Sequence, residues 1–241
     1  VGSADGILIQ TPSGRNLLIN GGPSTATLSD ALGRRLPPFN RQLDWLIVAS
    51  TQENQVGGLV RTLERFTPQN TLWAGLSQSS FSAQQLQEWL TQQGIPLTYA
   101  APGQALDLGQ GATLTVLTSD NRGAILLVAW NNFRAVLPVG PSFAALESLE
   151  YGRTIGNVTV LLLGESGYAP VNPPQWIAHL RPQVAVLSVD AGDPNGLPNR
   201  ATLDALQGYT LLRTDQNGWI HIETDGTQLW VEAERAGEMS R

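Results

Sequence analysis

The order of the strand-length apolar segments constrains this chain more than any other feature. A predicted β-hairpin comes first, then strands that alternate with amphipathic helices, then an antiparallel meander, and then alternating strands and helices again. The expected strands are 6–10, 16–20, 44–49, 71–75, 96–100, 112–119, 124–130, 134–140, 158–164, 183–189, 209–214, 218–224 and 228–233. This order predicts an α/β (α+β) protein with two mixed sheets face to face and helices outside, a four-layer αββα sandwich.

The helices are predicted from apolar periodicity and capping residues. They are expected at 24–35, 56–66, 82–93 (beginning at Ser82), 141–152, 173–180 and 200–208. The segments 214–218 (TDQNG) and 224–226 (TDG) carry the signals of hairpin turns. No stretch is rich enough in Pro, Gly or Ser to be a linker. We therefore expect one domain over 1–233 and a frayed tail over 234–241.

Composition excludes several functional classes. The chain has 241 residues, no Cys, two His and a net charge of −6, and all of its 14 cationic side chains are Arg. Thiolate nucleophiles, disulfides and Cys-based zinc sites are excluded. Only Arg34 and Arg35 are adjacent, so the sequence gives no support for an electrostatic track along a phosphate backbone. No apolar run is long enough to span a bilayer. Val1 stands just before a core strand, so we expect a domain cut from a longer protein.

The loop after the strand 44–49 is unusually rich in amides. The stretch LIVASTQENQVGGL, at 46–59, reads as a buried strand, a polar loop and then Gly57-Gly58 before a helix. Loops at the carboxyl ends of strands are where α/β folds usually hold their functional groups. Here the loop supplies hydroxyls and amides, with Glu53 as its one charge.

Five segments together resemble the metallo-β-lactamase superfamily. They are VGSADGILIQTPSGRNLLINGGPS (1–24), LDWLIVASTQENQVGGL (43–59), FRAVLPVG (133–140), VTVLLLGESG (158–167) and PQVAVLSVDAGDPNGLPN (182–199). Within the superfamily the sequence is most similar to the C-terminal domain of ComEC-type proteins, the membrane channels of bacterial DNA uptake. The closing segment 211–226 also resembles the end of that domain. The resemblance implies the metallo-β-lactamase fold over residues 1 to about 223.

Members of that family hold two Zn or Mn ions, and the resemblance locates the ligand positions in this chain. They fall on Asn20, Ser50, Gln52, Asn54, Gln55, Pro141, Glu165, Ser166 and Leu197. Only the acid of the opening motif, Asp5, stands where the family has it. Catalytic divalent ions prefer imidazole, thiolate or carboxylate ligands, whereas amides are weak ligands and Pro and Leu offer none. We therefore expect vestigial metal-site positions, no metal, no other cofactor and no catalytic residue: a pseudoenzyme.

Alternative sites are possible on the sequence alone. A carboxylate site for Mg²⁺ or Ca²⁺ would use acids expected at one rim, namely Asp5, Glu53, Glu165, Asp190 and Asp193, although solvated loop acids are the commoner case. The segment GESG (164–167) invites a serine-nucleophile reading, but it lacks the nucleophile-elbow spacing and a nearby base. His179 is expected on a helix surface, and His221 is expected to face out from a sheet. The seven Trp residues are expected mainly to pack in sheets.

The resemblance also implies a biological setting. The parent protein would form the inner-membrane path for transforming DNA, with this domain attached on the extracytoplasmic side. Its partners would be the membrane channel portion of the same polypeptide and DNA. The expected role is structural or DNA-guiding without hydrolysis. The alternative is a metal-dependent nuclease or phosphodiesterase that uses the carboxylates.

Overall fold

The computed structural model describes residues 2–37 and 41–235, and its strands form two large sheets and one hairpin. The first sheet has five strands in the order β1-β2-β3-β4-β5, and the second has seven in the order β12-β11-β10-β9-β8-β7-β6. The strands of the first sheet are β1 (Ile7–Gln10), β2 (Asn16–Ile19), β3 (Leu43–Val48), β4 (Pro68–Trp73) and β5 (Leu97–Tyr99). Those of the second sheet are β6 (Ala105–Gly109), β7 (Ala112–Ser119), β8 (Ala124–Trp130), β9 (Phe133–Val139), β10 (Val160–Leu162), β11 (Val184–Leu187) and β12 (Thr210–Arg213). The separate hairpin is β13 (Ile220–Thr224) with β14 (Leu229–Ala233).

Both large sheets are mixed. In the first, β1 and β2 are antiparallel, and β2 to β5 are parallel. In the second, β6 to β9 form the antiparallel meander, and β9 to β12 are parallel. Each parallel step needs a crossover connection, which places helices against the outer faces of the sheets.

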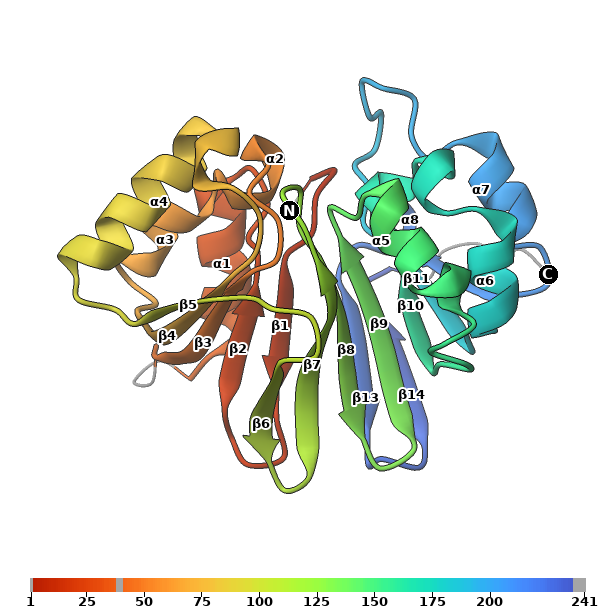
Figure 1. Ribbon diagram of the computed structural model, residues 1–241, viewed down its shortest axis with the longest axis horizontal. Helices are drawn as coiled ribbons and strands as arrows, with labels where there is room; N and C mark the ends of the chain where they lie inside the picture. Colours follow the sequence, from red (N-terminus) through yellow and green to blue (C-terminus); the bar gives the residue numbers. More distant parts are fainter. Residues whose placement is uncertain (1, 38–40, 236–241) are drawn as a thin grey trace.

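The helices cover the two outer faces (Figure 1). On the first sheet lie α1 (Thr25–Arg35), α2 (Glu53–Val56), α3 (Leu59–Leu63) and α4 (Phe81–Gln92). The second half carries α5 (Phe143–Ser148), α6 (Pro174–Leu180), α7 (Arg200–Ala205) and α8 (Thr214–Asn217). The predicted αββα sandwich is confirmed.

Strand alternation explains the layers. In β2, Leu17 and Ile19 belong to the core between the sheets, whereas Leu18 faces α1, α3 and α4. Successive side chains point to opposite faces of a strand, so a strand buried on both sides must be apolar at every position. The second sheet has its own outer core, where Trp176 and Ile177 of α6 pack against Leu161 of β10 and Ala185 of β11.

Three local predictions were wrong. The helix expected over 56–66 is interrupted at Gly57-Gly58, between α2 and α3. The segment 214–218 is not a hairpin turn: it contains α8, because β12 pairs with β11 rather than with β13. Helix α4 begins at Phe81 and is capped by Ser80, whose hydroxyl accepts from the Ala83 amide, rather than starting at Ser82. The strand β6 had not been predicted.

The chain ends beyond the described residues. Of the expected tail, Glu234 and Arg235 are held by backbone hydrogen bonds to Trp219 and Asn217, and 236–241 lie outside the description. Across 2–37 and 41–235, no helix has the length and apolar character needed to cross a membrane.

Candidate functional site

Two glycine-containing loops of the first sheet meet backbone to backbone. The amides of Gly21 and Gly22 donate to the Gln55 carbonyl at 3.0 and 3.1 Å, and the Gly58 amide donates to the Gly22 carbonyl at 2.8 Å. A Cβ on Gly58 would lie 3.0 Å from backbone atoms of Ser24. The close approach of the two loops therefore requires glycine at 58, and it fixes Gln55 at the carboxyl ends of β2 and β3.

The Gln55 side chain is the centre of a buried amide network. Its Oε1 accepts from the Asp5 amide at 3.1 Å and from Asn20 Nδ2 at 3.0 Å. Its Nε2 donates to Asp5 Oδ2 at 3.0 Å. Because a backbone N–H can only donate, the Asp5 amide fixes which end of the Gln55 amide is the oxygen. Gln55 is 3% exposed, so the whole network lies away from solvent.

Asn20 extends the network to β3. It is fully buried and has a left-handed backbone with φ 49°, a conformation that Asn tolerates better than most residues. Its Oδ1 accepts from the Ala49 amide at 2.8 Å and from the Ser50 amide at 3.4 Å. Both amide oxygens of the network therefore already accept two hydrogen bonds each, and no lone pair remains for a metal ion.

Asp5 is the one carboxyl group inside this network. It is 2% exposed, and its Oδ1 has no hydrogen-bond partner. Burial raises the pKa of Asp5 to about 7, the hydrogen bond from Gln55 opposes that rise, and the negative charge of Glu165 adds to it. The carboxyl group is therefore largely protonated below neutral pH.

An ion pair between two loops of the second sheet lies beside the network, and Gln52 joins it from the first half. Arg122, in the loop between β7 and β8, contacts Glu165 Oε1 with its Nη2 at 2.5 Å. Gln52 Nε2 donates to the same oxygen at 3.4 Å. The Glu165 side chain is 19% exposed, and Arg122 supplies the positive charge that neutralises it. Sequence reasoning missed Arg122, because nothing in its local pattern SDNRG sets it apart.

The structure brings most of the predicted site residues together. Asn20, Gln55, Asp5, Gln52 and Glu165 belong to the contacts above. Ser50 is fully buried and donates to the Arg122 carbonyl at 2.9 Å. Ser166, with φ 52°, is buried beside Glu165.

Three other positions lie outside the hydrogen-bonded network. Pro141 packs against Gly164, whose added Cβ would lie 3.3 Å from its ring. Asn54 turns outward and donates to the Ser3 carbonyl at 3.2 Å. Leu197 packs against the outer core of the second sheet. None of the three could hold an ion together with Gln55.

Two acids of the alternative carboxylate site, Glu53 and Asp193, each accept hydrogen bonds from neighbouring residues of their own. Glu53 accepts from the amide and hydroxyl of Ser82, which hold its pKa below the usual range. Asp193 Oδ1 accepts from the amides of Asn195 and Leu197. Within the described ranges, no group of three or more His, Asp or Glu side chains could hold a metal ion.

The serine-nucleophile interpretation requires a general base close to Ser166. His179 is half-buried and its Nδ1 lies 2.9 Å from the Tyr151 carbonyl oxygen. His221 is exposed on β13, as predicted, with Glu232 3.8 Å away. In the part of the chain that the structure describes, neither histidine contacts Ser166.

The comparisons with known proteins define the class by structure alone. No family model and no characterised protein sequence matches the chain. A Zn²⁺-bound PqqB from Methylobacterium extorquens aligns over 87% of this chain and 85% of its own, with 11% identity and a TM-score of 0.60. CmlA, a diiron β-hydroxylase from Streptomyces venezuelae, aligns over 87% of this chain and 53% of its own, with 14% identity and a TM-score of 0.53.

The arrangement of the two sheets and these structural neighbours show that the chain has the metallo-β-lactamase fold. The neighbours just named are a zinc-bound and a diiron protein. Asn20 and Gln55, where the sequence resemblance puts metal ligands, do not fit such a centre, because their side-chain oxygens already accept N–H groups. Among the described residues, the network itself contains the Asp5 carboxyl group, which is buried and readily protonated, and Glu165, close enough to raise the pKa of Asp5, is paired with Arg122.

Proposed function

We propose that this chain is a catalytically inactive metallo-β-lactamase-like domain of a ComEC-type competence protein. It would be attached to the inner membrane through its parent, on the extracytoplasmic side, and would support or guide transforming DNA without hydrolysing it. The motifs of the sequence support the ComEC assignment, and the buried amide network supports the lack of hydrolysis.

The proposed inactivity rests on one observation: Gln55 and Asn20 hydrogen-bond to each other, to Asp5 and to the backbone just after β3, so their side-chain oxygens are already occupied. A hydrolytic dinuclear site needs two cations about 3.5–4 Å apart that lower the pKa of a shared water. Here the side-chain oxygens of Gln55 and Asn20 already accept N–H groups, and the unpartnered acceptor beside them, Asp5 Oδ1, belongs to a buried carboxyl group that is readily protonated. The role that remains for the domain is binding and support.

The role can be tested by uptake of transforming DNA in the bacterium that encodes the chain. Deletion of this domain from the parent gene is expected to reduce transformation at least tenfold. The paired substitution Asp5→Asn with Glu165→Gln removes both carboxylates of the site, and transformation is expected to stay near the wild-type level. Loss of uptake in the paired variant, with its fold intact by circular dichroism, would favour the carboxylate-dependent nuclease instead. Normal uptake after deletion would overturn the proposed role.

A further inference from the structure

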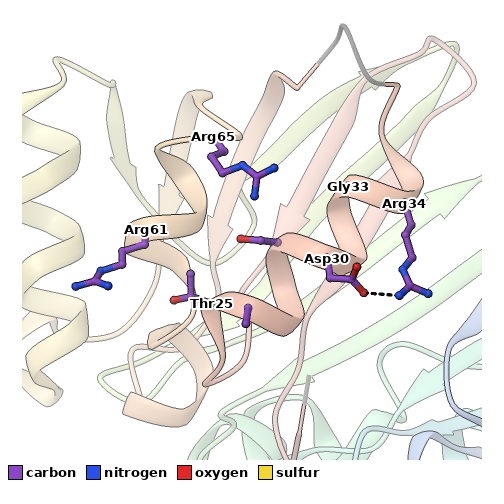
Figure 2. Close-up of a pocket in the computed structure, with 8 residues that line it drawn as sticks. Thr25, Asp30, Gly33, Arg34, Arg61 and Arg65 are labelled. Carbon is purple, nitrogen blue, oxygen red and sulfur yellow. Dashed lines mark ion pairs between the residues drawn. The ribbon is translucent and has the colours of Figure 1, made fainter.

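An open groove of about 830 Å³ runs between α1 and α3 on the outer face of the first sheet. Figure 2 shows Arg65 over this groove and Arg34 on its far side next to Asp30, while Arg61 extends outward from α3. The other lining residues are Thr25, Ala26, Ser29 and Gly33. The groove lies on the helical side of the molecule and shares no residue with the amide network.

A fourth arginine joins this surface through an aromatic ring. The guanidinium carbons of Arg41 and Arg65 lie 6.0 and 5.8 Å from the centroid of the Phe66 ring. Phe66 is fully buried, so it is a fixed point beside which both cations are placed. We call Arg34, Arg41, Arg61 and Arg65 the arginine face. Its members come from three segments of the chain, so the sequence did not reveal it.

The charge of the arginine face is only partly compensated. Asp30 pairs with Arg34 at 2.9 Å along α1. Arg61 and Arg65 are both exposed. Within residues 2–37 and 41–235, neither of them forms an ion pair. A local excess of positive charge therefore stands out on a chain whose net charge is −6.

The floor of the groove is made of small side chains. Ala26, Ser29 and Gly33 recur along one face of α1. A Cβ on Gly33 would meet nothing within 4 Å, and its backbone is not left-handed. Packing therefore does not explain a glycine inside this helix, where it costs about 1 kcal/mol relative to alanine. Its presence keeps the groove between the arginines wide.

The arrangement fits an extended polyanion better than a small anion or a membrane. The arginines are spread along the groove rather than aimed at one point (Figure 2). Guanidinium groups bind phosphates through paired hydrogen bonds, which suits a phosphodiester backbone. The exposed large apolar residues, which a membrane-inserting surface needs, lie elsewhere in the described chain: Leu76, Phe81, Tyr99, Phe143, Tyr168, Trp230 and Val231.

We infer that the arginine face binds the phosphate backbone of single-stranded DNA. This inference rests on the proposed function, and it names the surface by which the domain would guide the strand. Binding is mainly electrostatic, so it weakens steeply with salt and carries little sequence preference.

The test compares two double variants that remove the same charge. Arg61→Gln with Arg65→Gln removes the two arginines of the face that line the groove and form no ion pair within the described residues. Arg153→Gln with Arg200→Gln is the charge-matched control. Both arginines are exposed, at 72% and 89%, lie on the other half of the molecule, and pair there with the exposed acids Glu150 and Asp204. Binding of a fluorescent oligothymidine of about 20 nucleotides, longer than the site of one binding fold, is measured by anisotropy over a salt series.

The face variant is expected to raise the Kd at least fivefold at low salt. It should also reduce the slope of log K against log salt by roughly 1.4, the value for two phosphate contacts on a single strand. The control should match the wild type within twofold. Unchanged binding by the face variant would overturn the inference. The inference would also be overturned if the wild-type protein did not bind DNA, whether or not it bound vesicles containing phosphatidylserine.

The same variants separate this inference from the proposed function. If deletion of the domain abolishes uptake while the face variant binds DNA normally, the competence role is supported and the inference that the arginine face binds DNA is wrong. If the face variant loses DNA binding while deletion leaves uptake unchanged, the face is a DNA site and the competence role is wrong.

Discussion

The Gln55 side chain forms two hydrogen bonds with Asp5. Its Oε1 accepts from the Asp5 amide nitrogen at 3.1 Å, and its Nε2 donates to Asp5 Oδ2 at 3.0 Å. A carboxylate at this position cannot donate to Asp5, and a neutral histidine has one acceptor lone pair where Gln55 Oε1 accepts two hydrogen bonds. The amide at 55 is therefore matched to its neighbours as well as unsuited to a metal ion. A metal-binding side chain introduced at this one position should therefore destabilise the fold.

Gln55→Glu is expected to destabilise the protein by about 2–4 kcal/mol at pH 8, because it buries a second carboxylate against Asp5 without a counter-charge. The loss should shrink at pH 5, where protonation relieves the repulsion. Urea unfolding of wild type and variant measures the difference. Gln85→Glu, on the exposed face of α4, is the control and should change stability by less than about 0.5 kcal/mol. Equal effects of the two substitutions would contradict the network.

Asp5 should make stability depend on pH. Its pKa rises from 3.8 to about 7 on folding, so between these values the folded protein holds a proton that the unfolded chain has released. Unfolding then releases a proton, and stability falls as pH rises through this window, by up to about 1.4 kcal/mol per pH unit. Below pH 4 and above pH 7 this contribution is constant.

Asp5→Asn removes the titration and keeps an oxygen for Gln55 Nε2. The variant is therefore expected to be more stable than wild type at pH 8 and to lose the slope between pH 4 and 7. Thermal unfolding over that range gives the comparison. A variant whose stability still falls with the wild-type slope would show that another group is responsible.

Two glycines of the first half should respond in opposite directions to alanine. Gly33→Ala should stabilise the protein by about 0.5–1 kcal/mol, because the new methyl group meets open space inside α1. Gly21→Ala should destabilise it by about 1–3 kcal/mol, because the new Cβ would lie 2.6 Å from side-chain atoms of Leu28 and Leu59. Chemical denaturation of both variants checks the pair. Destabilisation by Gly33→Ala would mean that α1 and α3 pack more closely than described.

Most of the fold could be predicted from the sequence, because many of its strands are buried on both faces and are therefore apolar at successive positions. Apolar runs such as 44–49 and 124–130 can be read without tertiary knowledge, and their order alone predicts two sheets. The interruption between α2 and α3 could not be read, because it depends on the contact of Gly58 with Gly22 and Ser24. The strand β6 was missed because ALDLG at 105–109 is short and partly exposed.

The candidate site was predictable only in part. The resemblance located the positions of Asn20, Gln52, Gln55 and Glu165, but residue types alone do not give the direction of each hydrogen bond. Arg122 has no local signature, since its role comes from the contact with Glu165, 43 positions away. The arginine face depends in the same way on the packing of α1 against α3.

The most direct test of the account is the metal content of the protein. Purified without chelator, equilibrated with Zn²⁺ or Mn²⁺ and then desalted, the domain should retain well under one ion per chain by mass spectrometry. It should also cleave single-stranded DNA no faster in the presence of metal than in the presence of EDTA. One or two ions per chain that are lost in the Asp5→Asn, Glu165→Gln variant, together with metal-dependent cleavage, would contradict the account.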